Sequence, residues 1–274
     1  MLRLETENGW WLVTHPDHAH LSGAFAERWG NERFQRPEPR EQVLRGIARH
    51  DDGWMARDAS PQITRQGKPS AFSIEFVGKY SGFEEIDLVD FLAVRDSAVR
   101  GIAAEDPYAA LLISMHTYNL LNERSDKSTI APAQLPLMVQ FLESQKEFQA
   151  SLRKQIAADA RFTREQVSDS ILFDHFRLLQ ALDYLSLLTC VDFRQPAHLL
   201  HALPTRDGRH SPIHVRSAAP LHFILTPYPF PETPSRFYFP ARQVRGKIFS
   251  SSEELRNAIE AAPKETLCVT VSGS

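Results

Sequence analysis

The sequence predicts a mainly α-helical protein that carries a small, mostly antiparallel β subdomain. Apolar residues recur at helical spacing through most of residues 15–200, whereas after Pro196 short runs of β-branched and aromatic residues replace that pattern. The 274 residues are 42% hydrophobic and 24% charged, enough to bury a sizeable core. We therefore expect a helical core over 15–200, with residues 1–14 and 201–274 packed on it as an α+β appendage of one compact unit.

The first residues are expected to form a hairpin followed by a helix. Strand-like runs at 2–4 and 10–13 flank an Asn-Gly pair at 8–9, which is a strong hairpin signal. A helix then follows over 17–29, where Asp17 can cap the start and Gly30 ends it. This hairpin is expected to supply the N-terminal strands of the β subdomain.

Helices dominate the middle of the chain. Pro107 stands in a first helical turn, where proline is tolerated, and the segment 163–166 resembles a capping box that opens the last long helix. Residues 57–86 show neither helical nor strand periodicity and are expected to form a long loop or a lid-like insertion. The predicted helices cover 38–52, 88–105, 106–120, 135–158 and 163–191.

The C-terminal part reads as short strands with one helix. The strand-like runs are short and rich in β-branched and aromatic residues, and prolines separate them. We expect the N-terminal strands to join them in one small sheet. The predicted strands are 213–215, 221–225, 236–239 and 266–271, and the helix is 250–262.

Charge and composition argue against several classes of protein. A net charge of -3 and a pI of about 6.4 disfavour a broad nucleic-acid-binding surface. Cys190 and Cys268 lie in apolar runs and read as core residues, so no disulfide framework is expected. Because no apolar stretch reaches about 18 residues and no signal peptide is recognisable, we expect a cytoplasmic protein without a membrane span.

The most informative motif is the His50-Asp51 pair at the end of a predicted helix. Both residues share a face with Val43 and Ile47, so an imidazole and a carboxylate point where apolar side chains are expected. Burying a carboxylate without a partner is costly, and a divalent metal ion would compensate it. The alternative is a hydrogen-bonded structural pair.

Three other helices each place a metal-type ligand among apolar residues. His18 shares its face with small residues, His116 lies on the apolar stripe of its helix, and Asp183 stands in an otherwise apolar stretch. Each of them taken alone is more often a hydrogen-bonded core residue than a metal ligand. Together with His50 and Asp51, however, they are economically explained by one shared cation.

The order of these residues resembles the HD-domain superfamily of helical, metal-dependent phosphohydrolases and phosphodiesterases. The whole chain is also similar to an uncharacterised bacterial HD-like family with a small β appendage. The resemblance implies that Mn, Fe, Mg, Ni or Zn is bound, as one or two ions. The implied metal ligands are His18, His50, Asp51, His116 and Asp183.

Some positions of that resemblance remain open. His15 and His20 are rivals of His18 as the first ligand. His116 matches an intermediate histidine of two-metal relatives, which commonly have a second one. The remaining candidate, His175, lies about 80° round the helix from Asp183, which leaves the number of metal ions undecided.

The leading expectation is a hydrolase that uses a metal-activated water on a small phosphoester, such as a nucleotide. Asp52 would orient the water or act as general base, and His116 would be a ligand or would contact the phosphate. The alternatives are a non-haem iron oxygenase with the same ligand types and a non-catalytic ligand-binding or regulatory module. A homo-oligomer is an open possibility. The basic residues nearest the motif are Arg45, Arg49, Arg57, Lys68 and Lys79.

Overall fold

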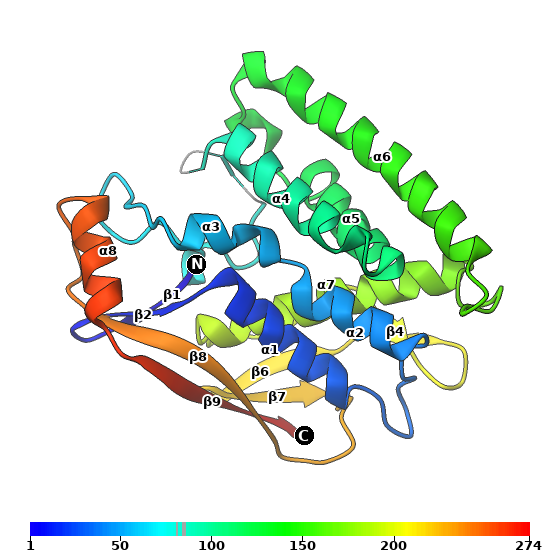
Figure 1. The fold of residues 1–274 in the computed structure, drawn as a ribbon. Coiled ribbons are helices and arrows are strands. Elements are labelled where there is room, and N and C mark those ends of the chain that lie inside the picture. The colour runs from blue at the N-terminus through cyan, green and yellow to red at the C-terminus, as the bar shows by residue number, and fades with distance from the viewer. Residues whose placement is uncertain (81, 84–85) are drawn as a thin grey trace.

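A computed structural model describes residues 1–80, 82–83 and 86–274 (Figure 1). The α-helices are α1 His15–Arg28, α2 Arg40–Arg49, α3 Met55–Asp58, α4 Leu88–Ala103, α5 Pro107–Asn122, α6 Leu135–Ala158, α7 Asp169–Cys190 and α8 Ser252–Ala261. Short 3-10 turns are η1 Asp52–Trp54, η2 Ile74–Phe76, η3 Lys127–Thr129 and η4 Pro132–Gln134. The strands are β1 Leu2–Thr6, β2 Gly9–Val13, β3 Ala197–His198, β4 Leu203–Pro204, β5 His210–Ser211, β6 His214–Ala219, β7 His222–Thr226, β8 Ser235–Arg245 and β9 Lys264–Gly273.

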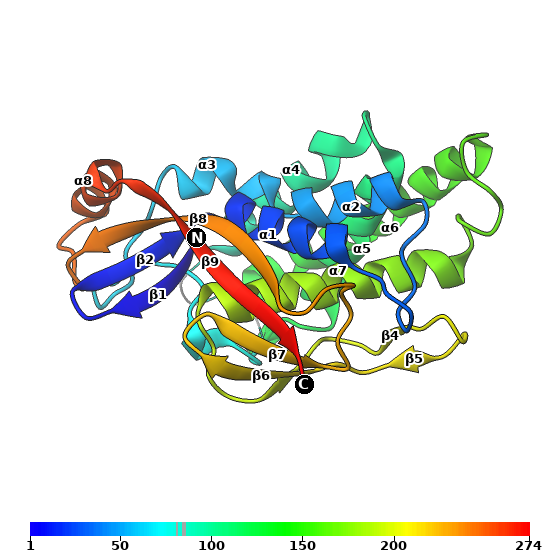
Figure 2. The same ribbon diagram turned by 90° about the horizontal axis from the view of Figure 1, so that it is seen from below.

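The prediction of a mainly α fold with a small β subdomain is wrong. A curled, mixed sheet of seven strands spans both ends of the chain in the order β1-β2-β8-β9-β7-β6-β3 (Figure 2). The pairing of β7 with β9 is parallel, and the other pairings in this sheet are antiparallel. The strands β4 and β5 form a separate pair. The sheet is therefore a major layer of the fold.

Two strands are longer than their sequence signals. β8 has 11 residues and β9 has 10, whereas the patterns predicted only 236–239 and 266–271. Pro240 interrupts the strand pattern of β8. At this position β8 pairs with β9 only, because β2 pairs with residues 242–245. Proline is tolerated at such a position because no ladder bond to β2 is needed there. The predicted joining of the N-terminal hairpin to the C-terminal strands is confirmed by the β2–β8 pairing.

The sheet and the helices share one core. Alternate residues of β8 point inward, and Phe237 packs edge-to-face on Phe25 of α1 with ring centroids 4.6 Å apart. The buried cluster continues into α5 and α7, whose buried residues are mostly apolar. Figure 1 shows α1 and α7 lying across the sheet. Strands of the C-terminal part therefore contribute to the main core, whereas Phe249 and Leu255 pack in a second cluster with Trp10 and Leu12.

The helices begin and end close to the predicted positions, with one exception. Asp87 and Asp106 cap α4 and α5 through side-chain bonds to Val89 and Ala109. The reciprocal bonds of the predicted capping box at 163–166 do form, but they close a turn, and α7 begins only at residue 169. Within the described part of the chain, every helix is too short or too polar to traverse a bilayer.

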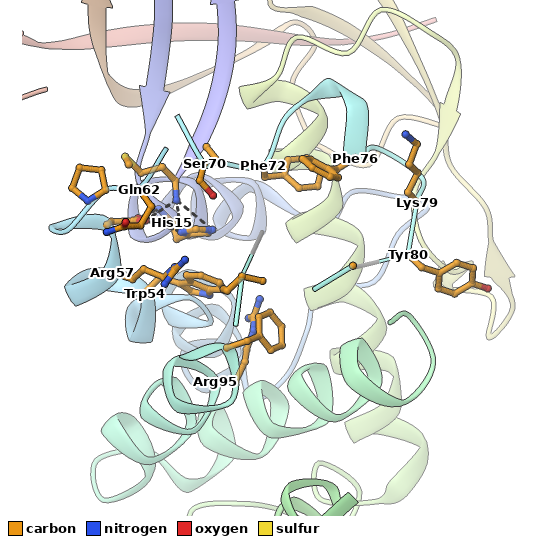
Figure 3. A pocket seen from close by; sticks show the side chains of 17 residues that line it. His15, Trp54, Arg57, Gln62, Ser70, Phe72, Phe76, Lys79, Tyr80 and Arg95 are labelled. Atoms are coloured by element: carbon orange, nitrogen blue, oxygen red, sulfur yellow. Dashed lines mark hydrogen bonds and ion pairs between the residues drawn. The ribbon is translucent and has the colours of Figure 1, made fainter. Parts of the chain in front are cut away.

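The segment 57–86 contains α3 and η2 and is otherwise irregular. Phe72 is anchored to the N-terminal strand by backbone hydrogen bonds with residues 1 and 3. Residues 81, 84 and 85 of the predicted lid lie outside the described residues. The described part of this segment lines a cavity of about 230 Å³ together with His15, Trp54 and Arg95 (Figure 3).

Candidate metal centre

The predicted metal ligands of four helical segments converge at one buried point. His18 comes from α1, His50 and Asp51 from the end of α2, His116 from α5 and Asp183 from α7. The five residues are between 0% and 9% exposed. Nε2 of His18 lies 3.0 Å from Oδ2 of Asp51, and Nε2 of His50 lies 3.3 Å from Oδ1 of Asp183. Nε2 of His116 lies 3.8 Å from the second oxygen of Asp183.

Small residues allow the helices to approach closely around this point. A Cβ atom on Gly23 of α1 would lie 2.6 Å from the Cβ of Ala48 in α2. Gly46 of α2 similarly packs against the backbone of Ala109 in α5. Because α2 is held tightly between α1 and α5, its C-terminal residues are delivered into the space between them.

His50 is oriented by its own helix. Its Nδ1–H donates to the carbonyl oxygen of Ile47 at 2.8 Å, so the neutral ring carries its lone pair on Nε2. That nitrogen is buried, has no hydrogen-bond partner among the described residues, and faces Asp183. A lone pair opposed to a carboxylate is unfavourable unless a proton or a metal ion lies between them.

His18 likewise has one ring nitrogen held by its surroundings and the other facing a carboxylate. Its Nδ1 lies 2.8 Å from the hydroxyl of Ser186, which also bonds to the carbonyl oxygen of Asp183 and to the hydroxyl of Ser22. Nε2 of His18 lies 3.0 Å from Oδ2 of Asp51, a contact that needs a proton or a metal ion between the two atoms. Two histidine nitrogens of the cluster therefore face carboxylate oxygens.

The carboxylates are held in their charged form. Burial raises the pKa of Asp51, but the charges of Arg95 and His50 outweigh it and hold that pKa well below its usual range. Burial likewise opposes ionisation of Asp183, but the hydrogen bond and charge of His50 and the charges of His116 and His18 lower its pKa to about 2. The centre thus keeps two negative charges to attract a cation.

The pKa values of His116 and His50 are shifted in opposite directions. Burial lowers the pKa of His116 to about 3, in spite of the attraction of Asp183. Burial also disfavours charge on His50, but Asp51 and Asp183 outweigh it and raise the pKa to about 9. In a metal-free protein, a proton on His50 would therefore occupy the position that a cation could take.

The spacing of the donor atoms fits metal coordination. Ligand bonds of about 2.0–2.2 Å place neighbouring ligand atoms about 3.0–3.5 Å apart, close to the 3.0, 3.3 and 3.8 Å of the His18–Asp51, His50–Asp183 and His116–Asp183 pairs. The donors form two overlapping groups, His18/His50/Asp51 and His50/His116/Asp183, with all atoms of a group within 4.8 Å. Each group contains two histidines and one carboxylate, which suits Mn, Fe or Zn.

The other predicted site residues lie outside this cluster. Asp52, the predicted base, is 22% exposed and pairs with Arg49 at 2.7 Å. His20 is exposed, and His175 bonds to the hydroxyl of Tyr108 at 2.9 Å. His15 stacks on Trp54 and bonds to Asp58.

Sequence reasoning missed two residues of the centre. Arg95 of α4 donates to Oδ1 of Asp51 at 2.5 Å and is only 7% exposed. The sequence did indicate that Arg95 is buried, because it lies one helical turn from Phe91 and from Val99 on the buried face of α4. Ser186, one turn after Asp183, gave no comparable signal because serine is common in buried helices.

Gly53 fixes the turn that follows Asp51 and supplies a stability prediction. A Cβ at this position would lie 2.0 Å from the carbonyl oxygen of Val94 and 2.7 Å from the amide nitrogen of Ala98. We expect Gly53→Ala to lower the unfolding free energy by about 2 kcal/mol or more, because α4 must shift. Thermal and urea unfolding of the variant measure this loss.

The control is Gly101→Ala in α4, where a Cβ has open space. This substitution should be neutral or should stabilise by up to about 1 kcal/mol, because alanine restricts the unfolded chain. Equal melting temperatures for Gly53→Ala and the wild type would contradict the close packing of η1 on α4.

Comparison with known proteins gives one match. A family profile described as "Protein of unknown function (DUF3891)" matches residues 1–246. The match ends just after β8, so α8 and β9 lie beyond it, although β9 is an interior strand of the sheet. No curated protein and no solved structure matched the chain.

Proposed function

The chain belongs to this DUF3891 family, and we propose that it is a metal-dependent hydrolase of small phosphoesters. The observation that carries the proposal is the pair of buried histidine nitrogens, on His18 and His50, that face charged carboxylates. A divalent cation would satisfy both nitrogens and both carboxylates at once. The residues that would hold it are His18, His50, Asp51 and Asp183, with His116 as a fifth ligand or a phosphate contact.

A divalent metal ion bound there would lower the pKa of a water and polarise a phosphoryl oxygen. The protein contributes orientation. Ile47 and Ser186 fix the rings of the two histidines through their Nδ1 atoms. Arg95 holds one oxygen of Asp51 and leaves the other facing His18. Such outer partners set the direction and basicity of ligands.

A phosphoester is favoured as substrate because cationic side chains lie on one side of the centre. Arg95 touches Asp51 and also lines a cavity, together with Lys79 and with Arg57, which pairs with Asp90. Guanidinium groups bind phosphate oxygens well. Asp52 pairs with Arg49, so it would act as a general base only after that pair had opened.

A second candidate is a non-haem iron oxygenase. Its support is the composition of the two donor groups, since two histidines and one carboxylate form the ligand set that such enzymes use for Fe(II). Iron with oxygen-sensitive absorbance would favour the oxygenase. Mn or Mg with turnover of phosphoesters in the absence of oxygen would favour the hydrolase.

The test is metal content followed by an activity screen. We expect about one or two transition-metal ions per chain, measured by elemental analysis of untagged protein purified without chelator. The metal-loaded protein should hydrolyse a panel of aryl and nucleoside phosphates, and chelation should abolish this turnover. The proposal fails if anaerobic reconstitution with Mn or Fe yields protein without bound metal.

The compartment is proposed from the cysteines. Cys190 is buried and Cys268 is exposed on β9, and both are free thiols. The expectation that both are core residues is therefore correct for Cys190 only. Free thiols are usual in a reducing compartment, so we propose the cytoplasm.

A further inference from the structure

Two exposed histidines lie side by side at the edge of the sheet, outside the candidate metal centre. His198 of β3 and His214 of β6 are 16 positions apart in the sequence, but the antiparallel register of these strands sets them directly opposite each other. Their ring centroids are 4.4 Å apart, and the ring planes are inclined at 58°. Directly opposed residues have Cβ atoms about 4.5–5.5 Å apart, so both rings can reach one ligand.

Both rings project from the solvent-exposed face of the sheet. Val215, the next residue of β6, is 3% exposed and packs in the core, whereas His198 and His214 are exposed. Because successive side chains of a strand point to opposite faces, the two imidazoles share the face that looks away from the core. A hydrated ion therefore reaches them without any rearrangement of the fold.

The nitrogens of these two rings are not engaged by the rest of the protein. His222, on the same face of the neighbouring strand β7, bonds to the hydroxyl of Ser272 at 2.9 Å. In the described part of the chain, by contrast, neither His198 nor His214 has a hydrogen-bond partner, and each ring contacts the other. A neutral imidazole carries one lone pair, so the pair offers two nitrogen ligands to a cation.

The separation of the rings favours a particular coordination geometry. An imidazole nitrogen lies about 1.1 Å from its ring centre, so metal–nitrogen bonds of about 2.0–2.1 Å place a metal ion about 3.2 Å from each centre. Two rings bound at a right angle then have centres about 4.5 Å apart, whereas the tetrahedral angle places them about 5.2 Å apart. The observed 4.4 Å matches the right angle of tetragonal Cu(II) and Ni(II) complexes. Rotation about the torsions of these exposed side chains turns one nitrogen of each ring toward the shared ion.

We propose that His198 and His214 chelate one divalent transition-metal ion at the edge of the sheet, with Cu(II) and Ni(II) preferred over Zn(II). The ion would take one nitrogen from each ring and keep water at its other positions. The two donor groups of the candidate metal centre share no ligand with this site. The inference is therefore independent of the proposed hydrolase.

The ion would hold together the two ends of the segment 199–213. β3 has two residues, and its ladder to β6 continues through the hydrogen bond from the amide of Leu199 to the carbonyl oxygen of Ile213 at 2.9 Å. The segment between these ends carries the β4–β5 pair. A metal ion that closes a loop at its base stabilises the folded protein, because the unfolded chain rarely brings the two ligands together.

Calorimetric titration with Ni²⁺ and Cu²⁺ tests the proposal on the wild type, His198→Ala and His214→Ala. Each substitution should remove about one bound ion per chain, or weaken its binding about 100-fold, because a second ligand on the same scaffold acts at high effective concentration. The candidate metal centre is intact in all three proteins, so any ion bound there contributes equally. In the wild type, free Ni²⁺ at about 100 times its dissociation constant should also raise the melting temperature by about 2–4 °C.

His222→Ala is the matched control. It removes a single imidazole from the same face of the sheet, and it should leave the number of bound ions and the melting-temperature shift as in the wild type. The two tested histidines are exposed, so their replacement should be tolerated, and circular dichroism checks that each variant is folded.

The outcomes separate chelation from adventitious binding. Unchanged Ni²⁺ binding in either His198→Ala or His214→Ala would overturn the shared site, and an equal loss in His222→Ala would show diffuse binding to surface histidines. Tighter binding of Zn²⁺ than of Ni²⁺ would contradict the right-angle geometry. Loss of one ion in both variants but not in the control supports the site, even in protein whose buried centre binds no metal and which hydrolyses nothing.

Discussion

His50→Ala and Asp183→Ala are each expected to remove the bound metal and to lower phosphoester hydrolysis by about 10³-fold or more. These residues face each other at 3.3 Å and come from different helices, so each truncation opens the centre from one side. Loss of a residue that only orients a ligand typically costs about 10- to 100-fold, and loss of a ligand itself should exceed that. Metal per chain and kcat/KM, measured on the same preparations, give the result.

His20→Ala is the matched control for these variants. His20 also belongs to α1, but it is exposed and lies outside the cluster, so both metal content and activity should match the wild type. Full metal occupancy in either His50→Ala or Asp183→Ala would place the metal elsewhere. Loss of metal in the His20 variant would instead indicate adventitious surface binding.

Asp51→Ala is expected to lower the unfolding free energy of the metal-free protein by about 3–5 kcal/mol. The substitution leaves the Arg95 guanidinium buried without its carboxylate, and breaking one half of a buried ion pair is strongly destabilising. Adding Arg95→Met should restore much of the lost stability, because methionine fills a similar volume without charge. Urea unfolding of the wild type, both single variants and the double variant gives the coupling energy.

The double variant separates folding from function. It should be stable but should still lack the metal, since one carboxylate ligand is absent. Glu143→Ala supplies the control, because its pair with Lys146 is exposed and should contribute at most about 0.5 kcal/mol. An Asp51→Ala protein as stable as the wild type would show that Arg95 does not depend on this carboxylate.

The candidate site could be predicted from the sequence because each candidate ligand breaks an apolar helical pattern. His116 and Asp183 stand within the buried faces of α5 and α7, so a period of 3.6 residues already aims them inward. The structure brings these residues together with His18, His50 and Asp51. Helical periodicity shows which side of a helix faces the core. Side chains on the inward sides of four helices that share a core can therefore meet.

The sheet could not be predicted in the same way. Trp10 pairs with Val244, which is far away in the chain and lies beyond the predicted strand 236–239. β9 gains most of its definition from its neighbours β8 and β7, because its residues Lys264, Glu265 and Thr266 are exposed and carry little strand pattern. Strand length was therefore set by tertiary pairing, which local propensity does not record.

The pairing of β2 with β8 also constrains the order in which the molecule can assemble. During synthesis the N-terminal hairpin emerges first, yet its partner strand emerges only after more than 200 further residues. Until then the outer edge of β2 is an open template for other strands, and α1 lacks the sheet against which Phe25 packs. Such long-range closure slows folding. A growing chain would thus contain all the helices that carry the candidate ligands before it has the strands that pack on α1, so maturation of the centre should wait until β8 has been synthesised.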